Sequence, residues 1–193
     1  LAVSKTQTPE QIRLCADLGQ KAFGENYVQE ALEKITVLRQ LALEWHLIGP
    51  LQSNKCPAAA AHFDWVQTVD REKIIKALDL HRPESLPPLN VLIQVNIDAE
   101  PGKSGCAPSE IKALALHIGA CRNLRLRGLM AIPDPETSSN GIAFALELGA
   151  DWVELDARRT ADARVIVHHD AELADGRTIV DLLRAELPDH VCD

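Results

Sequence analysis

The chain has 193 residues, of which 46% are hydrophobic and 25% charged, and its formal net charge is −8. This is enough apolar material for one core of ordinary size, and no apolar stretch is long enough to form a transmembrane helix. The acidic balance argues against nucleic acid as a partner, because phosphate binding requires clustered Lys and Arg.

Short β-branched or apolar runs alternate with amphipathic segments along the chain, which is typical of a parallel sheet with crossover helices. The predicted strands are Leu1–Ser4, Lys21–Gly24, Glu44–Gly49, Trp65–Val69, Asn90–Ile97, Leu124–Ile132, Trp152–Asp156 and Arg164–His168. The predicted helices are Pro9–Leu18, Val28–Leu41, Asn54–Phe63, Arg71–His81, Ser109–Cys121 and approximately Ser139–Leu148. Eight strands predict an α/β fold, a single TIM-type (β/α)8 barrel, incomplete or chimeric, with an open doubly wound sheet as the alternative.

The distribution of cysteines and the start of the chain bear on its origin. Five cysteines are scattered without CxxC spacing, which favours a reducing, cytoplasmic location. The chain opens at Leu1 directly on an apolar run, with no basic region and no cleavage site. We interpret it as a chain cut from a longer protein.

Charge changes sharply along the chain. Residues 1–137 contain 15 basic and 16 acidic residues, whereas residues 138–193 contain five Arg, no Lys and 12 acidic residues. A shift of this kind usually marks a domain boundary or a tail. No long Pro/Gly/Ser linker separates the two parts, so we expect one barrel-like domain with a seam in its sequence.

Lys5 directly follows the first predicted strand. In a parallel barrel the carboxyl ends of the strands form the active face, where a lysine can supply the amine for Schiff-base chemistry. A solvated strand-end charge is the alternative. His46 lies within an apolar strand, and a buried core histidine is the corresponding alternative to a ligand contact.

Several strings extend this pattern over much of the chain, namely AVSKT, FGENYVQEALEKI, LEWHLIGPLQSNK, FDWVQTVDR, PPLNVLIQVNI, KSG and LRLRGLMAIP. On these strings residues 1–137 closely resemble the YggS/PROSC family of pyridoxal-phosphate homeostasis proteins. The resemblance implies a TIM-like barrel, as in the alanine racemase N-terminal domain, with pyridoxal 5'-phosphate (PLP) on Lys5. It also implies a role in holding and handing on PLP. The further pocket residues that it implies are Asn26, His46, Ser53, Asn54 and Met130.

The sequence departs from this family after Thr137. The two loops that would hold the cofactor phosphate, after strands seven and eight, are replaced. Residues 138–193 instead resemble the N-terminal part of glycerophosphodiester phosphodiesterases, which are metal-dependent barrels. This second resemblance implies Glu154 and Asp156 as ligands of Mg²⁺ or Ca²⁺ and His169 as a catalytic residue, whereas Leu126 stands where the other catalytic histidine should be.

Three interpretations of the chain as a whole therefore stay open. The first is a PLP-binding protein with altered phosphate loops, joined near residues 127–141 to a phosphodiesterase-like segment. The second is a metal-dependent glycerophosphodiester phosphodiesterase fragment, and the third is an inactive chimeric barrel. Without the resemblance, a weak metal cluster or a solvated strand end would be the interpretation of Glu154, Asp156, His168, His169 and Asp170.

Overall fold

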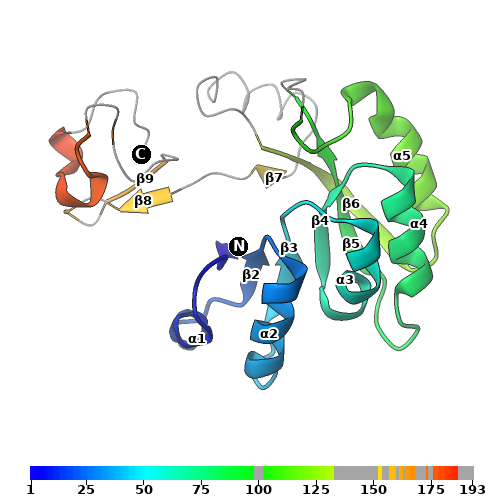
Figure 1. Cartoon of the computed structure of the whole chain (residues 1–193), viewed down its shortest axis with the longest axis horizontal. Helices are drawn as coiled ribbons and strands as arrows, with labels where there is room; N and C mark the ends of the chain where they lie inside the picture. Colours follow the sequence, from blue (N-terminus) through cyan, green and yellow to red (C-terminus); the bar gives the residue numbers. More distant parts are fainter. Residues whose placement is uncertain are drawn as a thin grey trace.

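Seven parallel strands form one sheet in sequential order from β1 to β7 in the computed structural model (Figure 1). The structure describes residues 1–97, 102–132, 152–153, 157–159, 161–162, 164–167, 173 and 176–186. The strands of this sheet are β1 (Ala2–Val3), β2 (Ala22–Glu25), β3 (Glu44–Leu47), β4 (Trp65–Val69), β5 (Leu89–Val95), β6 (Leu124–Ala131) and β7 (Trp152–Val153).

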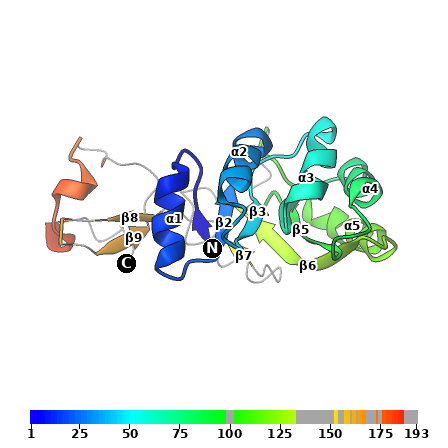
Figure 2. The ribbon, with the colours of Figure 1, turned by 90° about the horizontal axis from the view of Figure 1, so that it is seen from below.

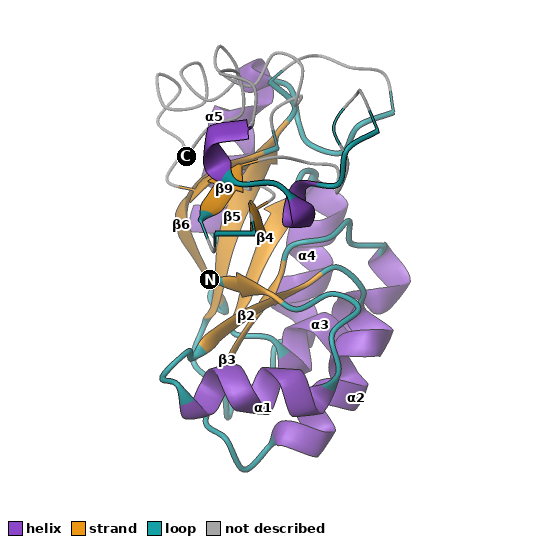
Figure 3. Ribbon diagram, turned by 90° about the vertical axis from the view of Figure 1, so that its left-hand side faces the viewer, coloured by secondary structure: helices purple, strands orange, loops and turns teal. Residues whose placement is uncertain are grey.

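Five helices connect the first six strands and lie side by side along one face of the sheet (Figure 3). They are α1 (Pro9–Asp17), α2 (Val28–Leu38), α3 (Cys56–His62), α4 (Glu72–His81) and α5 (Ile111–Gly119). Thr8 begins α1 with a capping box: its side chain accepts from the Gln11 N–H, and the Gln11 side chain accepts from the Thr8 N–H. The predicted helices in residues 1–121 are confirmed, with small differences at their ends.

The two faces of the sheet bury different kinds of residue. Trp45 and Leu47 pack into the main apolar core beneath the helices. His46 and Ile48 alternate with them along the chain and are buried on the opposite face. In a TIM-type fold this opposite face is the inside of the barrel, and its carboxyl-terminal edge is where ligands bind.

The last predicted strand does not join the barrel sheet. Residues Val165–Val167 (β9) pair antiparallel with Ala157–Arg159 (β8) in a separate two-stranded sheet (Figure 1). The expectation that Arg164–His168 would be an eighth barrel strand is therefore wrong for the described residues. An apolar run specifies a strand, but tertiary contacts select the partner with which it pairs.

The sheet nevertheless continues beyond Thr137. Trp152 and Val153 of β7 pair in parallel with Met130 and Ala131 of β6, as the prediction of a seventh strand required. The predicted helix at 139–148 lies outside the described residues. None of the helices formed by the described residues has the length and hydropathy of a membrane-spanning segment.

Candidate functional site

Lys5 lies in a tight turn at the carboxyl end of β1 and is half-buried. Ser4 still pairs with β2, because its N–H donates to the Gly24 carbonyl at 2.8 Å. The turn then closes when the Gln7 N–H donates to the Ser4 carbonyl at 3.0 Å. Lys5 is thus the first residue beyond the paired strand, as the sequence predicted.

A buried ion pair lies directly beside this turn. Lys34 of α2 donates to both carboxylate oxygens of Glu25, at 2.8 and 3.0 Å, and to the Ser4 carbonyl at 2.7 Å. The Ser4 hydroxyl donates to Glu25 at 2.5 Å. Lys34 also donates to Glu30 at 2.6 Å, and this hydrogen bond is the main cause that lowers the pKa of the Glu30 carboxyl. Lys34 and Glu25 were not among the residues predicted for the site.

Asn26 follows β2 at the same edge of the sheet. Its side-chain oxygen Oδ1 is buried and has no hydrogen-bond partner among the described residues. The backbone of Gly49 lies against the backbone of Asn26, and a Cβ atom at position 49 would be 2.1 Å from the Asn26 carbonyl oxygen. Gly49 is therefore required for Asn26 to occupy its place.

Gln94 and Met130 are paired neighbours on β5 and β6. Both are buried, and the Gln94 side-chain oxygen Oε1 also has no partner within the described part of the chain. Met130 was predicted as a pocket residue, whereas Gln94 was not. Next to this pair, burial raises the pKa of the Cys106 thiol to about 11, so the thiol stays protonated at neutral pH.

His46 lies deeper in the sheet than Lys5, at the level of Gly24. One ring nitrogen lies 2.8 Å from Glu44 and the other 2.9 Å from Gln67, while the ring stacks on Trp65. Burial lowers the pKa of the imidazole, against the opposing effect of Glu44. The contact of His46 with cofactor stays a prediction, and these contacts fix the orientation of its ring.

Ser53 and Asn54 lie in a short 3-10 helix, Ser53–Lys55, between β3 and α3. Ser53 is half-buried and Asn54 is exposed. Lys5, Asn26, Ser53 and Asn54 therefore all follow the carboxyl ends of the first three strands. Figure 2 shows helices α2 and α3 lying over strands β2 and β3. The structure places the predicted residues at one end of the sheet, with His46 below that end.

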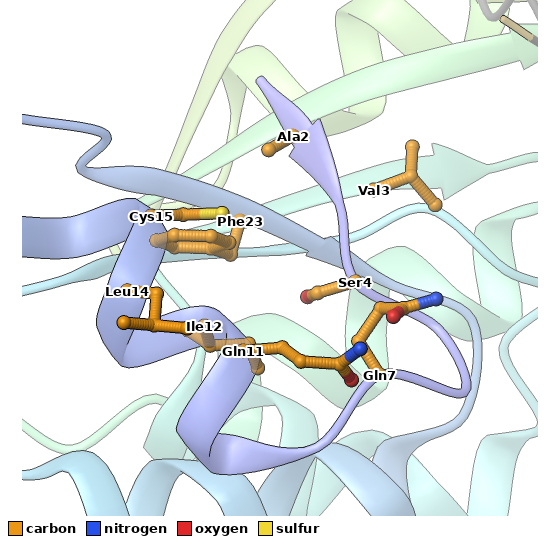
Figure 4. Close-up of a pocket in the computed structure, with 9 residues that line it drawn as sticks. All are labelled: Ala2, Val3, Ser4, Gln7, Gln11, Ile12, Leu14, Cys15 and Phe23. Carbon is orange, nitrogen blue, oxygen red and sulfur yellow. The ribbon is translucent and has the colours of Figure 1, made fainter. Parts of the chain in front are cut away.

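A cavity of about 400 Å³ lies between β1 and α1 (Figure 4). Ala2, Ile12 and Phe23 are among its mainly apolar lining residues, and Ser4 and Gln7 bound it near the Lys5 turn. None of the six predicted cofactor residues lines it. The cavity is on the helix side of β1, so we do not assign it to the cofactor.

The predicted metal and catalytic residues of the second resemblance, Glu154, Asp156 and His169, lie outside the described residues. Among the residues that the structure describes, no group of three His, Cys, Asp or Glu side chains could hold a metal ion.

Comparison with known proteins first shows to which class of protein fold this chain belongs. The sequence model of the family described as alanine racemase, N-terminal domain, matches residues 2–147. Among solved structures, PipY of Synechococcus elongatus with PLP bound superposes with a TM-score of 0.66 at 36% identity, covering 77% of this chain and 73% of PipY. An alanine racemase from E. faecalis is 18% identical with a TM-score of 0.60, over 77% of this chain and 43% of the racemase, which supports the fold alone. These matches confirm the TIM-type α/β fold.

Curated relatives define the family more narrowly. A pyridoxal phosphate homeostasis protein of Pseudomonas aeruginosa is 47% identical over 175 residues, covering 86% of this chain and 76% of the relative. The protein of the same name from Escherichia coli is 54% identical over 140 residues, covering 71% of this chain and 60% of the relative. The chain belongs to the pyridoxal phosphate homeostasis protein family. It spans about 60% of the length of several of these relatives.

The second resemblance is also found. The glycerophosphoryl diester phosphodiesterase family model matches residues 126–189 and overlaps the first match at 126–147. The predicted seam at 127–141 falls inside this overlap. The alignment with the Pseudomonas protein covers 86% of the chain, so the likeness to the homeostasis family continues past Thr137. The seam stays a prediction.

Proposed function

We propose that this chain binds PLP covalently through Lys5 and acts in holding and handing on the cofactor. The observation that carries the proposal is the position of Lys5, on a turn at the carboxyl end of β1 in a member of this family. The neutral amine of Lys5 would attack the aldehyde carbon of PLP, forming a C=N bond with loss of one water molecule.

The buried polar atoms at the same edge of the sheet fit such a ligand. Asn26 and Gln94 each present an amide oxygen that has no partner among the described residues. A buried acceptor without a partner costs about 1–3 kcal/mol, and a donor from a ligand would remove that cost. PLP carries a ring hydroxyl and, when protonated, a ring N–H. Met130 would add an apolar contact for the ring.

The experiment that tests the proposal is labelling of Lys5. The 193-residue protein is incubated with PLP, reduced with borohydride and mapped by peptide mass spectrometry. We expect the pyridoxyl label on Lys5 at low PLP concentration, and we expect Lys5→Ala to leave only the slow labelling of exposed lysines such as Lys112. Equal labelling of Lys5 and Lys112 in the unmodified protein would refute the proposal.

Pyridoxal without phosphate provides a matched ligand control. A phosphate held by several charge-assisted hydrogen bonds gains about 1.5–3 kcal/mol from each, so an intact phosphate site should favour PLP by more than about 100-fold. We propose that the phosphate loops of the family are replaced after Thr137, and on that basis we expect Lys5 to prefer PLP over pyridoxal by less than about tenfold. A preference above 100-fold would show that another part of the chain binds the phosphate.

A further inference from the structure

Thr6, the residue after Lys5, has an unusual backbone conformation. Its φ is +64°, and among the described residues it is the one non-glycine residue with a positive φ. Turns with a positive φ at the third position normally place Gly or Asn there. A β-branched residue is strained in this region, and such strain persists only where surrounding contacts hold it.

Helix α2 supplies those contacts on both sides of Lys5. The Thr6 N–H donates to the Glu30 carboxylate at 2.9 Å, and the same oxygen accepts from Lys34. Lys34 also donates to the carbonyl of Ser4, the first residue of the turn. The turn is thus held at Ser4 and at Thr6 by two side chains one helical turn apart.

These two side chains are themselves anchored. Lys34 is only 5% exposed and Glu25, its partner in β2, is fully buried. Glu30 is about one-third exposed, and its carboxylate is fixed from below by Lys34. The contacts therefore connect the strained peptide beside Lys5 to a buried charge pair in the sheet.

We propose that Glu30 and Lys34 are positioning residues that hold the Ser4–Gln7 turn in its strained form and so fix where Lys5 presents its amine to PLP. Without the Glu30 carboxylate, Thr6 can relax to a negative φ, and the direction of the chain at Lys5 changes with it. This inference rests on the proposed function of Lys5. It concerns how the amine is positioned, which the family resemblance does not address.

The test compares Glu30→Ala with a matched control, Glu72→Ala, in the full chain. Glu72 forms the same (i, i+4) carboxylate–lysine pair with Lys76, on the exposed surface of α4. The readout is the rate at which PLP and borohydride label Lys5, divided by the rate at Lys112 in the same sample. We expect Glu30→Ala to lower this ratio about tenfold, because Thr6 relaxes and the strained turn that positions Lys5 becomes less populated. We expect Glu72→Ala to leave the ratio unchanged.

A rescue variant separates positioning from general stability. Glycine adopts a positive φ without strain, so Thr6→Gly in the Glu30→Ala background should return the labelling ratio to within about threefold of the unmodified protein. Urea unfolding of both variants is measured alongside, because a change that acted through stability alone would follow the free energy of unfolding and not the backbone conformation at Thr6. Failure of this rescue would overturn the inference.

Amide hydrogen exchange distinguishes this inference from the proposed function. We expect the Thr6 N–H to exchange at least about tenfold faster in Glu30→Ala than in the unmodified protein, whether or not PLP binds. Unchanged exchange, or faster exchange with an unchanged labelling ratio, would overturn the positioning role and leave the proposed function intact. No preferential labelling of Lys5 in the unmodified protein would overturn the proposed function and, with it, the positioning role.

Discussion

Replacing Lys34 with Met should destabilise the protein much more than removing an ordinary helix lysine. Lys34 donates to both oxygens of Glu25, whose side chain is fully buried. After Lys34→Met, the Ser4 hydroxyl is the remaining described donor to this carboxylate. Breaking one side of a buried pair typically costs about 3–5 kcal/mol, because the other charge stays buried and uncompensated.

That cost is a large part of the stability expected of a domain of this size, which is about 5–15 kcal/mol. The measurement is urea unfolding followed by tryptophan fluorescence. Lys76→Met is the matched control, because Lys76 is a largely exposed helix lysine paired with an exposed glutamate. Its loss should change the free energy of unfolding by less than about 0.5 kcal/mol.

A double variant tests the assigned cause. Glu25→Gln removes the buried charge and keeps an oxygen for the Ser4 hydroxyl, so adding it to Lys34→Met should restore about 2 kcal/mol or more. The reasoning would be refuted if Lys34→Met were within about 1 kcal/mol of the Lys76→Met control, or if the double variant were less stable than Lys34→Met alone.

Two further predictions concern Gly49 and His46. Gly49→Ala should lower the free energy of unfolding by more than about 3 kcal/mol, because its Cβ would overlap the Asn26 backbone, whereas Gly119→Ala, with nothing within 4 Å, should cost nothing. Urea unfolding of the two variants checks this, and equal stabilities would contradict the close approach. Burial lowers the pKa of His46 in the folded protein. Below the unfolded pKa of about 6.5, the unfolded chain therefore binds a proton that the folded protein does not, and the free energy of unfolding falls as the pH falls from 7 to 5. His46→Gln should flatten that fall in unfolding experiments at several pH values, and an unchanged slope would show that His46 does not cause it.

The order and type of the elements were predictable from the sequence in residues 1–132. The strands are short runs of mainly apolar or β-branched residues, and the helices have apolar faces, with a clear start signal in Thr8 at α1. These signals are local in the chain. Trp65–Val69 forms with the predicted bounds, and the other elements differ only at their ends.

The position of Lys5 was also predictable, because a residue that directly follows a strand of a parallel barrel must lie at the active face. The roles of Lys34 and Gly49 were not. In the sequence Lys34 is one of several charged residues of an amphipathic helix, and Gly49 is an ordinary strand-end glycine. The importance of Lys34 comes from its contacts with Glu25 and Ser4, which are 9 and 30 residues away along the chain. The importance of Gly49 comes from its approach to the Asn26 backbone.

The sequence by itself thus determined the alternation of strands and helices, the family resemblance and the lysine at the end of β1. The tertiary structure decided which strands pair, so that Val165–Val167 forms a hairpin with β8 instead of an eighth barrel strand. It also decided that a charged pair is buried beside Lys5 and that the Glu30 carboxylate accepts from the N–H of Thr6, whose φ is positive. The physical reason is that periodicity and capping act between near neighbours, whereas strand pairing, burial of charge and backbone strain depend on residues that only the folded chain brings together.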